Sequence, residues 1–174
     1  QYLISKTHIE DQTFIEFGVG DYTESNTQFL LMNNNWKGLI IDRSELCVNS
    51  IKSRELYWRH DLTAVCAFVD KDNINQIIFD HSFSGQIGLL SIDVDGNDYW
   101  IWESITVVDP IIVVIEYNST FGNKYAITIP YDPLFERGEA HYSHLLNFLF
   151  GMPNKSNAFP AIKLVKSFIV FGLW

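Results

Sequence analysis

The sequence predicts an α/β fold in three layers, with a mostly parallel central sheet between two layers of helices. Five short apolar segments alternate with segments of helical periodicity, and each apolar segment ends in an acidic residue or leads into a glycine turn. Strands that alternate with helices build a parallel sheet, because each helix returns the chain to the edge where the next strand begins. The five expected strands begin at Thr13, Leu39, Ala64, Gly88 and Ile111.

Length and composition indicate one globular domain. The chain has 174 residues, of which 47% are hydrophobic, enough for a full core. Its formal net charge of −9, with lysines and arginines scattered singly, disfavours nucleic acids as partners and favours a small or neutral molecule. No apolar run approaches the roughly 20 residues of a membrane helix, and a basic-then-apolar signal pattern is absent from the first residues. We therefore expect a soluble, cytoplasmic protein without a membrane partner, of open oligomeric state.

The first expected strand, Thr13 to Phe17, leads into a turn that contains Gly18 and Gly20. Glycine permits backbone angles and close approach that a β-carbon prevents, so we expect another group to lie against this turn. A helix is expected directly afterwards, with Ser25 or Asn26 as its N-cap. A strand, a glycine turn and a helix N-terminus in this order are typical of a nucleotide-binding site.

The charges around this turn indicate which ligand it takes. A dinucleotide site has the pattern G-x-G-x-x-G, and here Thr23 stands at the third glycine position, so the pattern for NAD is not met. Glu16 at the end of the strand and Asp21 after the turn would repel a diphosphate and attract a ligand with an ammonium or sulfonium group. S-adenosylmethionine carries both groups.

The second expected strand ends at Asp42, about 20 residues beyond the glycine turn, where dinucleotide folds place a ribose-binding acid. The two carboxylate oxygens of Asp42 match the two hydroxyl groups of a ribose. The alternative is that Asp42 only begins the turn before a helix from Glu45 to Arg54 that Ser44 caps.

Two blocks of the sequence resemble a known enzyme family. The block E-F-G-V-G-D, from Glu16 to Asp21, resembles motif I of class I S-adenosylmethionine-dependent methyltransferases. The block L-S-I-D-V-D-G-N-D-Y-W-I-W-E, which begins at Leu90, resembles the fourth-strand block of FkbM-type and sugar O-methyltransferases. The resemblance covers residues 13–132 and is poor beyond residue 138. The family often has a further glycine where Tyr22 stands, a departure that would narrow the methionine side of the pocket.

The resemblance implies the methyltransferase variant of the Rossmann-like fold, as a single domain over residues 1–174. About residues 13–110 would form the cofactor half, and residues 111–174 a divergent acceptor half. In the class I fold the last two strands form an antiparallel hairpin, for which the segments 161–165 and 167–174 are the candidates.

The same resemblance implies a set of cofactor-binding residues. Asp70, directly after the third expected strand, would accept a hydrogen bond from the adenine amine. The alternative is that Asp70 only caps the helix that follows. The residues expected to hold the cofactor are Glu16, Gly18, Gly20, Asp42, Asp70 and Asp93.

Acidic and amide side chains follow the fourth and fifth expected strands. Asp93 and Asp95 project to the same side if the strand period of two continues, and Glu116 and Asn118 do the same on the next strand. Asp93, Glu116 and Asn118 offer only oxygen ligands, which suits Mg²⁺, and some sugar O-methyltransferases that this block resembles bind a divalent metal at matching strand ends. The alternative is a set of hydrogen-bonded acids that positions loops without a metal.

Three residues are candidates for the catalytic step. Asp93 lies at the strand end that would face the acceptor. His141 and His144, three residues apart in an expected helix, titrate near neutrality, so either could accept the proton of a hydroxyl group. The alternative for both histidines is an ordinary amphipathic helix.

These observations predict an S-adenosylmethionine-dependent methyltransferase that acts on a hydroxyl group, with a sugar or another small polar metabolite as acceptor. The first alternative is a non-catalytic domain that binds S-adenosylmethionine but whose divergent C-terminal third does not close over an acceptor. A nicotinamide-dependent oxidoreductase is a further alternative, which Thr23 and Glu16 disfavour.

Overall fold

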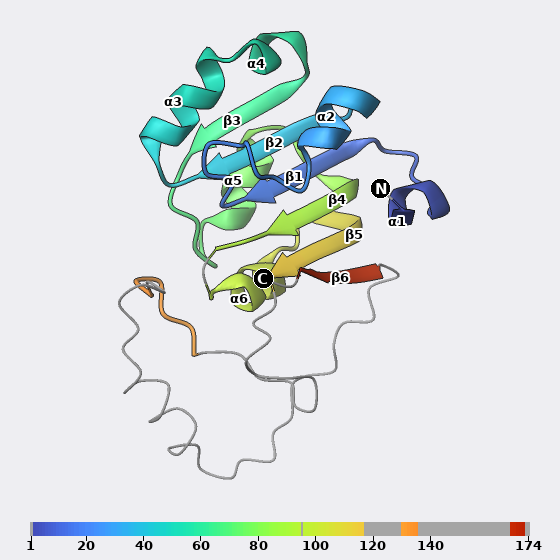
Figure 1. Ribbon diagram of the computed structural model, residues 1–174. Coiled ribbons are helices and arrows are strands. Elements are labelled where there is room, and N and C mark those ends of the chain that lie inside the picture. The colour runs from blue at the N-terminus through green and yellow to red at the C-terminus, as the bar shows by residue number, and fades with distance from the viewer. Residues whose placement is uncertain (1, 95, 117–129, 136–167, 173–174) are drawn as a thin grey trace.

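A single parallel sheet with helices on both faces organises the molecule (Figure 1). The computed structural model describes residues 2–94, 96–116, 130–135 and 168–172. In these ranges six strands are hydrogen-bonded in the order β3-β2-β1-β4-β5-β6, and each neighbouring pair is parallel. The expected α/β class, with its three layers and parallel sheet, is confirmed.

All five strands expected from the sequence are present, and a sixth follows near the end of the chain. The strands are β1 (Thr13–Phe17), β2 (Lys37–Asp42), β3 (Leu62–Cys66), β4 (Gly85–Ile92), β5 (Val108–Glu116) and β6 (Phe168–Gly172). The helices of the described residues are α1 (Tyr2–Lys6), α2 (Gln28–Asn34), α3 (Glu45–Ser53), α4 (Glu55–Arg59), α5 (Ile74–Asp80) and α6 (Asp98–Ser104).

Two apolar clusters separate the sheet from its helices. Leu31 of α2, Val48 of α3 and Leu56 of α4 pack in one buried cluster, on one face of the sheet. Ile78 of α5 and Ile101 of α6 pack in the other cluster, on the opposite face. Each helix buries one apolar stripe against the sheet. The helices are divided between its two faces, so both faces of the sheet are covered.

The side chains of β1 alternate between these two layers. Phe14 packs on the side of α2 and α3, whereas Ile15 and Phe17 pack on the side of α5 and α6, because successive side chains of a strand point to opposite faces. Glu16 therefore shares the side of Phe14. Its register partner in β4 is Ser91, so the alternation brings two polar side chains together inside one apolar layer.

The sequence predicts a third strand from Ala64 to Val69 and a surface loop from Glu55 to Ala64, and both predictions are wrong in part. The third strand ends at Cys66 and does not reach Val69, because its register partner at that point is Asp42, the last residue of β2. A strand without a neighbour has no ladder to continue. The segment expected to be a loop contains the short helix α4, in which the Arg59 guanidinium donates to the Glu55 carboxylate at 2.7 Å, four residues apart.

The last described strand differs from the class I arrangement. The segment Phe168–Gly172 pairs in parallel with β5, with Val113 opposite Ile169. An antiparallel hairpin strand at this place would run the other way. The expected hairpin partner, residues 161–165, lies outside the described residues. The sheet thus continues past β5 in the same direction as its other strands.

Among the residues that the structure describes, each helix is too short or too polar to cross a lipid bilayer. The longest of them, α3, has 9 residues, whereas a membrane helix needs about 20.

Asn75 of α5 joins this helix to the segment that leads from α6 into β5. Its Nδ2 donates to the Ser104 carbonyl at 2.7 Å, and its Oδ1 accepts from the backbone amides of Thr106 at 2.8 Å and Val107 at 3.2 Å. One side chain thereby satisfies three backbone groups at the end of a helix, where partners within the helix are lacking.

We expect Asn75→Ala to lower the free energy of unfolding by about 2 kcal/mol, because three backbone groups lose their partner. Denaturant unfolding measures this loss. The control is Asn33→Ala on α2, whose amide makes one long bond of 3.4 Å to the Phe29 carbonyl at the surface; its cost should stay within about 0.5 kcal/mol. Equal effects of the two variants would contradict the role of Asn75.

Candidate functional site

The strand order places a switch point between β1 and β4. Starting from β1, the chain adds β2 and β3 on one side and then returns to add β4 and β5 on the other. In open parallel sheets, ligands bind outside the carboxyl ends of the strands where the order reverses. The arrowheads of β1 to β4 point to the left of Figure 1, so the segments that follow these four strands lie along that edge.

The glycine turn after β1 contacts the backbone of the chain at Gly18 and has open space beside it at Gly20. Gly18 has φ +73°, and a β-carbon there would lie 1.7 Å from the Asp93 carbonyl oxygen. Gly20 has φ +53°, and no heavy atom of the described residues comes within 4 Å of the position of its β-carbon. The close approach expected from the glycines is therefore with β4 at Gly18, and Gly20 leaves space beside the turn.

Asp42 at the end of β2 is bound to the glycine turn. Its Oδ2 accepts from the Gly20 backbone amide at 2.7 Å, and its Oδ1 accepts from the Ser44 amide at 2.7 Å. The residue is 9% exposed. Ser44 caps α3 through its side chain, which accepts from the Cys47 amide. Asp42 thus begins the turn, as one interpretation expected, and each of its oxygens keeps a further lone pair for a ribose hydroxyl.

Glu16 is buried beneath the loop that joins β1 to α2, which we call the elbow (residues 18–27). Its carboxylate accepts from the Asn26 amide at 2.9 Å, from the Thr27 amide at 3.2 Å and from the Thr27 hydroxyl. Burial raises the pKa of the Glu16 carboxyl, and the bonds from Thr27 and Asn26 oppose that rise. The sequence predicts a contact between Glu16 and the cofactor; the structure describes a carboxylate that holds the elbow from below.

This arrangement corrects the expected N-cap of the helix after the turn. The N-cap of α2 is Thr27, one residue after Asn26 and two after Ser25. The Ser25 hydroxyl still accepts from the Gln28 amide at 3.0 Å. Because a carboxyl group of the chain already binds the amides in front of the helix, Glu16 takes the place that a bound anion has in a dinucleotide fold.

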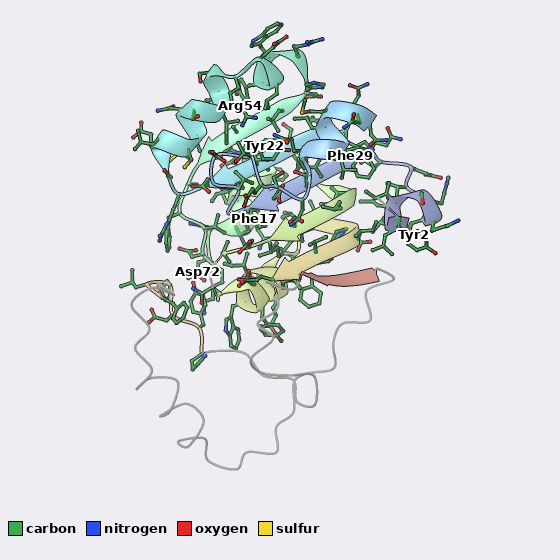
Figure 2. The ribbon with its side chains drawn as sticks, in the orientation of Figure 1. Tyr2, Phe17, Tyr22, Phe29, Arg54 and Asp72 are labelled. Atoms are coloured by element: carbon green, nitrogen blue, oxygen red, sulfur yellow. The ribbon has the colours of Figure 1, made fainter. Side chains whose placement is uncertain are left out.

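Tyr22 fills the elbow at the position where the resembling family often has glycine. It has φ +64°, is fully buried, and its hydroxyl lies 3.0 Å from the Thr27 hydroxyl, which in turn donates to Glu16. Tyr22 packs in the apolar cluster on the α2 and α3 side of the sheet, and Figure 2 labels it just below Arg54. The Arg54 guanidinium donates to the Asp21 carbonyl at 2.8 Å. The left-handed backbone that glycine would adopt freely is here adopted by a tyrosine held by its ring and hydroxyl.

Asp70 forms the turn that leads into α5, the helix after β3. Its Oδ1 accepts from the backbone amides of Asp72 at 2.9 Å and Asn73 at 2.8 Å, and its carbonyl accepts from Ile74. The N-cap of α5 is Asn73, so Asp70 stabilises the turn before the helix and is not the cap itself. The contact with an adenine amine stays a prediction.

Three carboxylates meet at the ends of β4 and β5. Asp93, Asp98 and Glu116 each offer an oxygen atom, and these oxygens lie within 4.8 Å of one another. We call them the acidic cluster. Asp98 accepts from the backbone amides of Val94 at 2.9 Å and Gly96 at 2.8 Å. Burial raises the pKa of the Asp98 carboxyl, and the nearby Glu116 adds to the rise.

The acidic cluster contains two members of the expected metal site and adds Asp98, which was not among the metal ligands expected from the sequence. The sequence predicts Asp93, Glu116 and Asn118, and the structure brings Asp93 and Glu116 together with Asp98. Asp98 is the first residue of α6. It reaches the other two because the segment after β4 turns back on itself, and strand periodicity does not describe that turn.

Four expected residues lie outside the described part of the chain. They are Asp95, Asn118, His141 and His144. The catalytic roles predicted for the two histidines, and the metal contact predicted for the asparagine, stay predictions.

Sequence reasoning missed Ser91, which lies at the centre of the polar network below the elbow. Its hydroxyl is fully buried, donates to Glu16 at 3.4 Å and accepts from the Asn26 side-chain amide at 3.1 Å. The available signal is a single serine inside the apolar run from Gly88 to Ile92, because a buried hydroxyl needs a polar partner.

Comparison of the chain with protein-family models, with curated proteins and with solved structures finds no match.

Proposed function

We propose that the chain binds S-adenosylmethionine at the switch point between β1 and β4 and transfers its methyl group to a hydroxyl group of a sugar or another small polar metabolite. The observation that carries the proposal is the position of Glu16, whose carboxylate binds the Asn26 and Thr27 amides in front of α2. In a dinucleotide fold a pyrophosphate binds at that place. A carboxyl group of the chain already takes these donors, so the elbow favours a ligand without a diphosphate.

The cofactor would lie across the open part of the elbow. Asp42 reaches the ribose hydroxyls with the lone pairs that Gly20 and Ser44 leave free. The space beside Gly20 allows the ligand to approach the backbone. The acidic cluster, at the ends of β4 and β5, provides the negative charge that an ammonium and a sulfonium group require. The resemblance of the two sequence blocks to methyltransferases supports the same ligand.

The reaction is a displacement at the methyl carbon. The bond from this carbon to the sulfonium sulfur breaks while a bond to the acceptor oxygen forms, and the sulfur keeps the electron pair as a neutral thioether. The hydroxyl proton passes to a base, for which Asp93 is the candidate in the acidic cluster. Positioning the two reactants in line supplies much of the rate in such a reaction.

A divalent cation fits the chemistry of this cluster. Its members offer only carboxylate oxygens, the ligands that Mg²⁺ prefers. A bound cation would lower the pKa of an acceptor hydroxyl. Burial and the nearby Glu116 raise the pKa of the Asp98 carboxyl, and a bound cation would oppose that rise.

We expect Asp42→Ala to weaken the binding of S-adenosylhomocysteine by about 1–3 kcal/mol, because charge-assisted hydrogen bonds to the ribose are lost. Calorimetric titration measures the affinity, with NAD as a second ligand on the wild-type protein. The control variant is Asp109→Ala, an exposed acid in β5, at the opposite end of the strand from Glu116. Unchanged affinity in Asp42→Ala would reject the ribose contact, and binding of NAD in place of S-adenosylhomocysteine would reject the proposed ligand.

Methyl transfer itself separates the enzyme from a binding domain. We expect labelled methyl groups from S-adenosylmethionine to appear on a hydroxylated acceptor in a screen of sugars and small polar metabolites. Tight binding of S-adenosylhomocysteine together with no transfer to any acceptor in the screen would favour a non-catalytic domain that binds the cofactor.

A further inference from the structure

A short segment from the C-terminal part of the chain lies against the carboxyl edge of the sheet. This segment, residues 130–135, which we call the strap, is drawn in orange at the lower left of Figure 1. It contacts two separate parts of the cofactor half, the loop after β3 and the beginning of α6. These two parts lie side by side because α5 and α6 pack on the same face of the sheet.

Tyr131 is the residue of the strap that touches the loop after β3. Its hydroxyl accepts from the Lys71 backbone amide at 3.4 Å, and the Lys71 ammonium lies 4.8 Å from the centre of its ring. A cation over an aromatic face is attracted by the electrons of the ring. Lys71 directly follows Asp70, the acid proposed to face the adenine amine.

The strap is also fixed at α6. The Asn97 side-chain amide donates to the Asp132 carbonyl at 2.7 Å, and its oxygen accepts from the Asp132 backbone amide at 3.4 Å. The ring of Trp100 meets the ring of Tyr131 edge to face, with their centres 6.4 Å apart. Contacts on both sides therefore hold the half-buried Tyr131 in one place, between the loop after β3 and α6.

We infer that Tyr131 is a specificity-determining residue of the cofactor site, which recognises the flat base of an adenosine-containing ligand at the end of the site near Asp70. The inference rests on the proposed function and names a residue from the acceptor half for the binding of the cofactor. A planar aromatic ring favours a planar base, because stacking or edge contacts bury both surfaces together. The Lys71 ammonium lies over one face of the Tyr131 ring, so a base would meet the opposite face or the edge of the ring.

The inference is tested by titrating wild type and two variants, Tyr131→Ala and Tyr131→Phe, with adenosine and with S-adenosylhomocysteine. We expect Tyr131→Ala to weaken the binding of both ligands by the same factor, about tenfold, because the lost contact is with the adenine base that they share. Tyr131→Phe keeps the ring and should restore affinity to within about threefold of wild type. The control is Trp58→Ala on α4, an aromatic residue that is 72% exposed, which should leave both affinities unchanged.

A second measurement uses only the wild-type protein. Adenosine should slow hydrogen exchange at the backbone amides of Tyr131 and Asp132, because a base bound to the Tyr131 ring stabilises the strap against local opening. This readout holds whether or not the alanine variant folds. Thermal unfolding shows whether a loss of affinity in a variant comes with loss of the fold.

The outcomes separate the inference from the proposed function. Wild-type affinity for adenosine in a folded Tyr131→Ala variant, an equal loss in Tyr131→Phe, or no change in exchange at the strap would each overturn the role of Tyr131. Wild type could bind adenosine, with the expected loss in Tyr131→Ala, and yet not bind S-adenosylhomocysteine. In that case the proposed function fails and the inference stands. If wild type binds neither ligand, both fall.

Discussion

Gly18→Ala is expected to lower the free energy of unfolding by about 3 kcal/mol or more, because the new β-carbon has no room. It would lie 1.7 Å from the Asp93 carbonyl oxygen and 2.9 Å from the carbonyl carbon. Both atoms belong to the backbone, so no side chain can turn away to relieve the contact. The positive φ of +73° adds strain for any residue with a β-carbon. Denaturant unfolding of the two proteins measures the loss.

Gly20→Ala is the matched control for this substitution. Gly20 also has a positive φ, of +53°, but no heavy atom of the described residues lies within 4 Å of where its β-carbon would be. We expect a cost of about 1 kcal/mol, from the left-handed backbone alone. The difference between the two variants isolates the contact of Gly18 with Asp93. Equal losses would mean that the contact contributes nothing.

Because Gly18 touches Asp93, its substitution should also reach the proposed site. A shift of the Asp93 backbone moves a member of the acidic cluster and the edge of the elbow together. In a Gly18→Ala variant that still folds, the affinity for S-adenosylhomocysteine should fall through the shift of Asp93. Gly20→Ala should weaken the same ligand by a different route, because its β-carbon would enter the space through which the ligand approaches the backbone. Calorimetric titration compares the two variants directly.

Glu16→Ala is expected to cost about 2–4 kcal/mol of unfolding free energy, since it removes the acceptor of several buried donors at once. The amides of Asn26 and Thr27 and the Thr27 hydroxyl all donate to this carboxylate. The substitution also affects Tyr22, because the Tyr22 hydroxyl is linked to Glu16 through the Thr27 hydroxyl. Urea unfolding measures the cost. Asp21→Ala, at an exposed acid of the same elbow, serves as the control and should cost much less.

The pH dependence of Glu16 follows from the direction of its pKa shift. Burial raises the pKa of this carboxyl above its ordinary value of 4.5 in the folded protein. The folded state then holds the proton more strongly than the unfolded state. The Glu16 carboxyl therefore contributes most to the stability of the folded protein at low pH. This contribution is lost as the pH rises from about 4.5 through the raised pKa of the folded protein.

Glu16→Gln isolates this effect, because its side chain does not titrate. The stability of wild type relative to Glu16→Gln should therefore fall as the pH rises through that window, while the other raised acid, Asp98, is present in both proteins and cancels. A difference between the two proteins that stays constant with pH would contradict the assigned burial of the carboxyl. Unfolding curves across the acidic range supply the comparison.

The order of strands and helices could be predicted because it depends on local patterns. The apolar run of β1, the glycine turn and the Ser44 cap of α3 each depend on residues within one turn or one strand. Asp42 could be placed near the turn because it ends a strand at a known spacing, and its bond to Gly20 is in keeping with that reasoning. The limits of β3 could not be predicted, since they depend on where the neighbouring strand ends.

The candidate site was predictable where residues follow strands and unpredictable where they follow turns. Asp93 and Glu116 end neighbouring strands, and the structure brings them together. Asp98 joins them only because the chain turns back after β4. The backbone amides of Val94 and Gly96 then donate to the Asp98 carboxylate. The partnership of Glu16 with Ser91 likewise depends on register, which pairs two strands 75 residues apart in the chain.

By itself the sequence determined an α/β chain with acids and glycines at the ends of its strands, because strand and helix periodicity and turn chemistry act over a few residues. The tertiary structure alone decided which of these groups meet. It brought Ser91 to Glu16 and Tyr131 of the strap to Lys71, and it placed β6 in parallel beside β5. These contacts join residues far apart in the chain, and their partners are selected by packing across the sheet and not by any local pattern.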